Sequence, residues 1–214
     1  MAADALKATI KVCMFDQYGT VVDMQKGLTE AVGHRAVAYT LERAGIPHTM
    51  DEVHSLVAQI ERLTPFPDVP EALARLKTRY RIVVLSNGDP DMLDAAKAFH
   101  ETQFDAVISV AVASSFKPHV ATYTKGAQIV GVRMDEVLFV ANHAFDCIGA
   151  KAAGMHTAFI DRRRRPFGAT PYQPDIVAPD MKSLAGDEVH APKRPAGATT
   201  AARKLVNSRS FEIR

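Results

Sequence analysis

The chain has 214 residues, 47% of them hydrophobic, which suffices for one large domain with its own core and a small insertion. Its formal net charge of +2 argues against nucleic acid or a membrane surface as a partner. Two cysteines do not suggest a disulfide framework, and no apolar stretch reaches the about 20 residues that span a bilayer. We therefore expect a cytoplasmic protein with reduced thiols at Cys13 and Cys147.

The predicted elements alternate between strands and helices along the chain. Short hydrophobic runs rich in β-branched residues predict strands at Ile10–Phe15, Arg81–Ser86, Asp105–Val110, Val137–Val140 and His156–Ile160. Helical spacing of apolar residues predicts helices at Pro70–Tyr80, from Asp89 or Pro90 onward, at Val120–Val130 and at Cys147–Gly154. This alternation predicts an α/β fold, a Rossmann-like parallel sheet with helices on both faces.

The predicted core is interrupted between its first two strands. Residues 1–23 and 64–185 form the expected α/β core, and residues 24–63, with two helical patterns, form an insertion. The tail at 186–214 is rich in Ala, Pro, Gly, Thr and basic residues, so we expect it to be mostly disordered. The basic run Arg162–Arg165 is expected in a solvated loop that adds positive potential near the site entrance.

The first strand ends in a candidate nucleophile. Asp16 directly follows the apolar run and precedes a glycine turn, in the sequence Phe-Asp-Gln-Tyr-Gly-Thr. Ligands of open α/β sheets bind outside the carboxyl ends of the strands, and a carboxylate there can attack a substrate. Taken alone, the pattern fits a turn aspartate stabilised by its own backbone equally well.

Three further junctions of strand and polar turn follow in order. Ser86 and Asn87 end the second strand and offer side-chain donors before a helix start, where anions bind favourably. Lys117 precedes the helix at 120–130 and could keep a nearby carboxylate ionised. The fourth strand leads into the polar segment 141–146, which ends at Asp146. Four such junctions in series favour a site over four unrelated turns.

These segments resemble the four motifs of the haloacid dehalogenase (HAD) superfamily. Within it the chain is most similar to the type II 2-haloacid dehalogenases, whose pattern is F-D-x-Y-G-T, L-S-N-G, K-P-x-x-x-x-Y and a polar run ending in an aromatic residue and Asp. The resemblance extends from about Lys11 to Phe167. It implies a HAD-type sheet with a helical cap inserted after the first strand, here the reduced segment 24–63.

The resemblance also implies a mechanism, in which Asp16 displaces halide from a short 2-haloalkanoic acid and water hydrolyses the resulting aspartyl ester to a 2-hydroxy acid. The implied catalytic residues are Asp16, Thr20, Lys117, Tyr123, Asn142, His143 and Asp146. The residues implied to receive the substrate carboxylate and the halide are Gln17, Tyr18, Ser86 and Asn87. Lys117 would position Asp16, and Asp146 would orient or deprotonate the water. His143 admits two interpretations, a proton carrier or halide contact, or an ordinary loop side chain.

Two positions separate this pattern from the phosphatases of the same superfamily. Tyr18 stands where they carry a second aspartate that works as general acid, and Asn142 stands where they carry an acidic magnesium ligand. A magnesium site prefers several carboxylates, so we expect no metal and no other cofactor. A phosphatase-like hydrolase is the first alternative, and Tyr18 and Asn142 both argue against it.

A second alternative is a catalytically impaired relative that works as a binding protein. The cap looks shortened, and neither Arg35 nor Arg43 matches the arginine with which the family's cap grips the substrate. Ala141 also replaces a serine that is usual in the final motif. Dimerisation is common among these relatives, so a homodimer is open as a partner besides the small haloacid.

Overall fold

The computed structural model describes residues 2–17, 19–22, 49, 51, 63–88, 90, 93–94 and 104–186. The predicted insertion at 24–63 lies almost entirely outside these residues, as does the tail after Gly186 and the predicted substrate contact Tyr18. Among the described residues no helix is long and apolar enough to cross a membrane.

Six parallel strands form one sheet in the order β3-β2-β1-β4-β5-β6. The strands are β1 (Val12–Phe15), β2 (Arg81–Ser86), β3 (Ala106–Ser109), β4 (Val137–Ala141), β5 (His156–Ile160) and β6 (Ile176–Ala178). The described helices are α1 (Ala2–Thr9), α5 (Val69–Lys77), α7 (Val120–Val130), α8 (Ala144–Ala152) and α9 (Met181–Ala185), with short 3₁₀ turns η1 (Val110–Ala113) and η2 (Met134–Glu136). The expected α/β architecture is thus confirmed.

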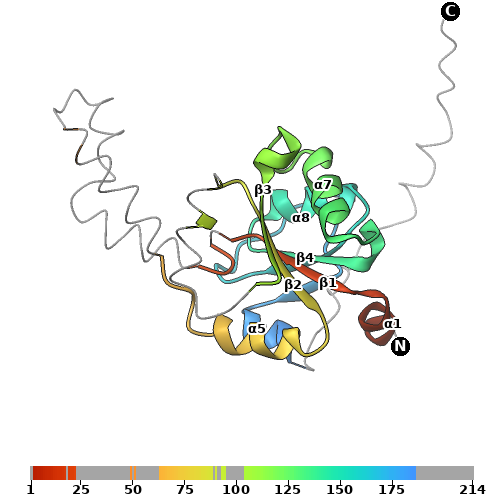
Figure 1. Cartoon of the computed structure of the whole chain (residues 1–214). Coiled ribbons are helices and arrows are strands. Elements are labelled where there is room, and N and C mark those ends of the chain that lie inside the picture. The colour runs from red at the N-terminus through yellow and green to blue at the C-terminus, as the bar shows by residue number, and fades with distance from the viewer. Residues whose placement is uncertain are drawn as a thin grey trace, which may run out of the picture.

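Helices cover both faces of the sheet, with α5 and α9 on one side and α7 and α8 on the other (Figure 1). Alternate residues of each strand enter the two cores: Cys13 and Phe15 pack under α5 and α9, whereas Val12 and Met14 face α7 and α8. Because both faces are buried, the strands read as continuous hydrophobic runs rather than as an alternation of apolar and polar residues.

Several predicted boundaries were wrong by a few residues. β1 begins at Val12 rather than Ile10, and the helix after β4 begins at Ala144 rather than Cys147, so Asp146 lies in its first turn. α5 covers Val69–Lys77 instead of 70–80. α1, β6 and α9 were not predicted, because each is too short to show a clear period.

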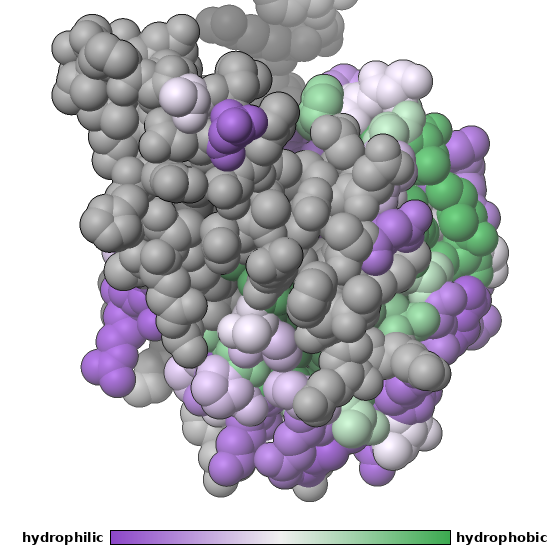
Figure 2. Space-filling view, turned by 60° about the vertical axis from the view of Figure 1, so that its left-hand side comes forward, coloured by the Kyte–Doolittle hydropathy of each residue, from purple (hydrophilic) through white to green (hydrophobic). Residues whose placement is uncertain are grey.

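Exposed hydrophobic side chains gather on one part of the surface. Figure 2 shows a hydrophobic area at its upper right. Among the described residues, the large exposed apolar side chains are Val112, Phe116, Val120, Ile129, Phe145 and Tyr172. Four of them belong to η1, to α7 or to the loop between the two, which also carries Lys117.

The expected role of Arg162 was wrong. Its guanidinium makes a two-pronged ion pair with Asp68, with N–O distances of 2.9 and 3.1 Å, and lies 4.1 Å from the centre of the Phe66 ring. Asp68 also accepts a hydrogen bond from the backbone N–H of Met181, at the start of α9. The arginine therefore ties the segment after β5 to the start of α5, whereas the next three arginines are exposed, as predicted.

We expect Arg162→Ala to lower the free energy of unfolding by about 2 kcal/mol, because it leaves the half-buried Asp68 without its cation. Arg163→Ala, which removes an exposed neighbour, is the matched control and should change stability by less than about 0.5 kcal/mol. Chemical denaturation of both variants measures the difference. Equal stabilities would contradict a structural role for Arg162.

Candidate active site

The predicted site residues meet at the carboxyl edge of the sheet. Asp16 follows β1 directly, and its backbone N–H donates to the carbonyl of Val140 on the neighbouring strand at 3.0 Å. Ser86 is the last residue of β2, and the segment from Asn142 to Asp146 follows β4. Parallel strands end at the same edge, so residues far apart in sequence are brought together here.

A buried lysine joins two carboxylates at the centre of this site. The ammonium of Lys117 lies 2.8 Å from Oδ1 of Asp16 and 2.8 Å from Oδ2 of Asp146. The hydroxyl of Tyr123, on α7, donates to Oδ1 of Asp146 at 2.5 Å. All four side chains are buried. Their convergence supports the predicted roles of Lys117, Tyr123 and Asp146 around Asp16.

The second oxygen of Asp16 faces a different set of groups. The hydroxyl of Thr20 donates to Oδ2 at 3.0 Å and accepts from the backbone N–H of Asn142 at 2.9 Å. Nδ1 of His143 lies 3.8 Å from the same oxygen, beyond hydrogen-bond length. The His143 side chain is 32% exposed against 10% for Asp16, so it forms the more open side of the carboxylate.

The electrostatic environment shifts the pKa values of the two carboxyl groups in opposite directions. Burial raises the pKa of Asp16, but the Lys117 ammonium and, less strongly, His143 outweigh it, and the pKa lies below its ordinary value. For Asp146, burial and the charge of Asp16 exceed the opposing effects of Lys117 and Tyr123, and the pKa is raised. Burial lowers the pKa of Lys117, but the two carboxylates outweigh it and raise the pKa overall. Asp16 is therefore held as an anion, and Asp146 is the carboxyl group better suited to exchange a proton.

Asn87 has both ends of its carboxamide engaged with the backbone of Lys117. Its Oδ1 accepts from the Lys117 N–H at 2.9 Å, and its Nδ2 donates to the Lys117 carbonyl at 3.4 Å. This pairing fixes the loop that carries Lys117 against the end of β2. Asn87 was predicted as a substrate contact, and its contact with the backbone of Lys117 was not predicted.

The remaining predicted contacts lie close by. Ser86 is buried and its hydroxyl accepts from the backbone N–H of Gly88 at 3.1 Å. Gln17 is buried as well, and its Oε1 has no hydrogen-bond partner among the described residues; the same holds for Oδ1 of Asn142. Ala141 ends β4 inside the core. Within the described part of the chain, no three His, Cys, Asp or Glu side chains gather as metal ligands.

Two glycines allow the site segments to approach each other. Gly19 has φ +83°, and a Cβ there would lie 3.2 to 3.3 Å from the side chains of Asn142 and His143. Gly149 lies inside α8, where a Cβ would come within 2.6 Å of Pro118 and 2.8 Å of the Tyr123 hydroxyl. Sequence reasoning missed Gly149, although a glycine inside a helical pattern is a recognised sign of close packing.

We expect Gly149→Ala to lower the free energy of unfolding by about 1–3 kcal/mol, because the added methyl group overpacks the contact with Pro118 and Tyr123. Gly126→Ala is the matched control, since it also lies inside a helix but would meet only the ends of Leu85 and Met14, at 3.2 to 3.5 Å. We expect a change of less than about 1 kcal/mol for it. Thermal and chemical unfolding of the two variants would test this, and equal losses would contradict the proposed contact.

A family model described as haloacid dehalogenase-like hydrolase matches residues 33–154. The (S)-2-haloacid dehalogenase of Xanthobacter autotrophicus is 39% identical over 150 residues, which are 69% of this chain and 59% of that protein. Haloacetate dehalogenase H-2 of Moraxella sp. (strain B) is 31% identical over 152 residues, 70% of this chain and 68% of that protein.

Solved structures agree. The L-2-haloacid dehalogenase of Xanthobacter autotrophicus, with chloropropionic acid covalently bound, matches 82% of this chain and 97% of that chain, with a TM-score of 0.68 and 29% identity. The aligned segment spans less than two thirds of the first of the curated relatives, 59% of its length. The family model and the relatives, together with the motifs and the fold, show that the chain belongs to the haloacid dehalogenase-like hydrolases.

Proposed function

We propose that this protein is a hydrolytic dehalogenase that converts short 2-haloalkanoic acids to 2-hydroxy acids and halide. The observation that carries the proposal is the buried carboxylate of Asp16, held ionised 2.8 Å from the ammonium of Lys117 at the carboxyl end of β1. The relatives named (S)-2-haloacid dehalogenase and haloacetate dehalogenase act on substrates of this class, and one of them has been solved with chloropropionic acid covalently bound.

In the first proposed step, a carboxylate oxygen of Asp16 attacks the carbon that bears the halogen. The new C–O bond forms as the carbon–halogen bond breaks, and the halide leaves with the bonding electron pair. The attack comes from the side opposite the halogen, so the configuration of a chiral carbon inverts. Splitting the reaction at this ester replaces one difficult displacement by water with two easier steps.

In the second step, water attacks the carboxyl carbon of the Asp16 ester. The C–O bond between that carbon and the ester oxygen breaks, which releases the 2-hydroxy acid and regenerates the carboxylate. The water gives up a proton, for which Asp146 is the proposed acceptor because its raised pKa makes its carboxylate the stronger base. Lys117 and Tyr123 hold Asp146 in place. A correctly positioned base of this kind contributes roughly 10²–10⁴ in rate.

The test is halide release from chloroacetate and from each enantiomer of 2-chloropropionate, with excess chelator present. We expect release of halide, no loss of rate with chelator, and a preference for the (S) enantiomer. Release of phosphate from a small phosphate ester, dependent on added magnesium, would instead support the phosphatase-like alternative. Binding of short carboxylates without turnover by folded protein would support the impaired relative.

We further propose a cytoplasmic homodimer. Both cysteines are free and buried, which suits a reducing compartment. The exposed apolar side chains of Val112, Phe116, Val120 and Ile129 offer a surface for a second copy. Analytical ultracentrifugation of the full chain tests the dimer, and a monomer at micromolar concentration would count against it.

A further inference from the structure

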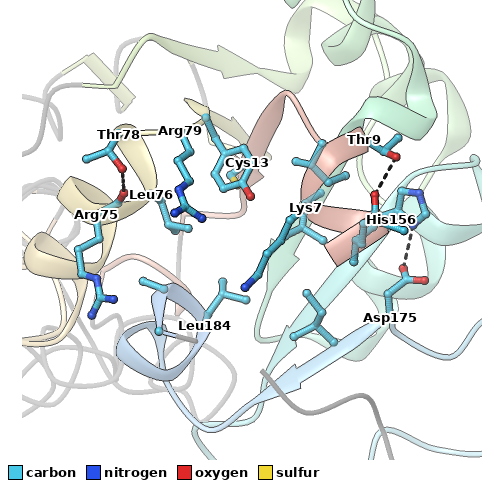
Figure 3. A pocket seen from close by; sticks show the side chains of 18 residues that line it. Lys7, Thr9, Cys13, Arg75, Leu76, Thr78, Arg79, His156, Asp175 and Leu184 are labelled. Atoms are coloured by element: carbon cyan, nitrogen blue, oxygen red, sulfur yellow. Dashed lines mark hydrogen bonds and ion pairs between the residues drawn. The ribbon is translucent and has the colours of Figure 1, made fainter. Parts of the chain in front are cut away.

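A cavity lies at the amino ends of the strands, whereas Asp16 lies at their carboxyl ends. It has a volume of about 700 Å³ and opens on the face of the sheet that α1, α5 and α9 cover (Figure 3). Its walls include Cys13 near the start of β1, His156 at the start of β5, and the turn at 78–80 that precedes β2. Asp16 sits at the opposite edge of the same sheet, so the two sites are separate.

The cavity is lined mostly by apolar groups. The larger aliphatic side chains of its wall are Leu6, Ile10, Leu76, Leu138, Ile176 and Leu184. Burial raises the pKa of the Cys13 thiol to about 12, so this sulfur lines the wall as a neutral group and is not a nucleophile near neutral pH. The cavity therefore suits the binding of an apolar body rather than chemistry on a substrate.

Positive charge surrounds this apolar wall. Lys7, Arg75 and Arg79 line the cavity, and Figure 3 shows the side chains of Lys7 and Arg79 directed toward the same space, beside Leu184. Among the described residues that line the cavity, Asp175 is the one carboxylate, and it is already paired with Lys151. No ion pair joins Arg75 or Arg79 to another described residue. Arg75 and Arg79 thus give the rim of the cavity a positive charge that is complementary to an anion.

We propose that this cavity binds an amphipathic organic anion, a carboxylate or sulfonate carried on an aliphatic or aromatic body. The anionic head would pair with Arg75 and Arg79, and the body would lie on Leu6, Leu76 and Leu184. The volume falls in the range of about 300–1,000 Å³ that is typical of sites for drug-sized ligands. It is far larger than a short haloacid needs, so the ligand is not the substrate proposed for Asp16.

The tail of the chain is a less suitable occupant. Gly186 lines the cavity and is followed by two acidic residues, Asp187 and Glu188, but the rest of the tail carries six basic residues and one acidic residue, the basic ones including Lys193, Arg194, Arg203 and Lys204. A basic segment has the same sign as the rim formed by Arg75 and Arg79. Charge complementarity therefore favours a separate anionic molecule over the tail.

The probe for this proposal is 8-anilinonaphthalene-1-sulfonate, an aromatic sulfonate whose fluorescence rises in apolar surroundings. We expect the folded full-length chain to bind one equivalent saturably, and dodecanoate to displace it. The double variant Arg75→Gln/Arg79→Gln should weaken binding at least about 10-fold, in line with two lost charge-assisted contacts. Arg163→Gln/Arg165→Gln, which alters exposed cations outside the cavity, should leave the affinity unchanged.

A second pair of variants tests the location. Ala5→Trp places a large side chain on the wall of the cavity and should abolish binding. Ala152→Trp places the same side chain on an exposed position of α8, across the sheet, and should not. Dye binding that survives Ala5→Trp and the double arginine variant would overturn the proposal, as would the absence of saturable binding or a failure of dodecanoate to compete.

Discussion

Replacing Asp16 with Asn is expected to reduce halide release from chloroacetate by at least about 10⁴-fold, the scale on which enzymes lose rate when a nucleophile is removed. The carboxamide keeps the shape of the side chain but has no negative charge with which to attack carbon. The variant should nevertheless fold. Asp146 remains 2.8 Å from the ammonium of Lys117, so the buried lysine keeps one counter-ion after the substitution.

Stability is the internal control for this variant. Asp16→Asn removes the attraction to Lys117 together with the cost of burying one carboxylate and its repulsion of Asp146, and these effects oppose each other. We therefore expect a melting temperature within a few degrees of that of the unaltered chain. A loss of activity with retained stability identifies a catalytic group, whereas a joint loss would indicate only a structural one.

The fate of oxygen distinguishes the ester mechanism from direct attack by water. In a single turnover of the unaltered chain in heavy-oxygen water, the label should enter the carboxylate of Asp16, because water attacks the carboxyl carbon of the ester. The hydroxyl of the first product should carry ordinary oxygen. Label in the product and none in Asp16 would contradict the role of Asp16 as nucleophile.

Local sequence patterns were sufficient to place Asp16 and Ser86 at one edge of the sheet. Asp16 and Ser86 each end a buried hydrophobic run, and the carboxyl ends of parallel strands share an edge, so the two could be placed together without coordinates. Lys117 was a candidate only as one of four junctions in series, because a lysine before a helix is common in any sequence. Tyr123 was assigned by the resemblance alone, because a tyrosine within a helix is equally common.

Contacts between distant segments were not predictable in the same way. Asn87 binds the backbone of a residue 30 positions away, and Arg162 binds a carboxylate 94 positions away. Neither pairing leaves a trace in local periodicity or in turn chemistry, since each depends on how two loops meet in the folded chain. Gly149 is a similar case. A side chain at this position would collide with Tyr123, which lies on another helix.

Replacing Lys117 with Met is expected to reduce halide release at pH 7 by about 10³-fold, an electrostatic loss like that of removing one preorganised donor from a catalytic site. Lys117 is the largest influence that lowers the pKa of Asp16. Without it, burial remains as the largest influence and raises the pKa of Asp16, and only the weaker effect of His143 opposes it. The nucleophile would then be protonated, and therefore inactive, over a wider range of pH.

The loss of the Lys117 charge also sets the sign of the pH dependence. Because the pKa of Asp16 rises when Lys117 is lost, the residual activity of Lys117→Met should increase as the pH increases, up to the raised pKa. In the unaltered chain the pKa of Asp16 lies below its ordinary value, so activity should not fall through protonation of Asp16 until the pH is acidic. The pH profiles of halide release for the two proteins measure this displacement.

Lys125→Met is the matched control, since Lys125 lies on the exposed side of α7, two residues from Tyr123. It removes the same side chain without touching either carboxylate and should leave both the rate and the pH profile unchanged. If Lys117→Met lost activity but kept the original profile, the lysine would act by positioning rather than by charge. Such a result would contradict the view that its ammonium keeps Asp16 ionised, because the charge of Lys117 and the pKa of Asp16 are coupled by direct contact.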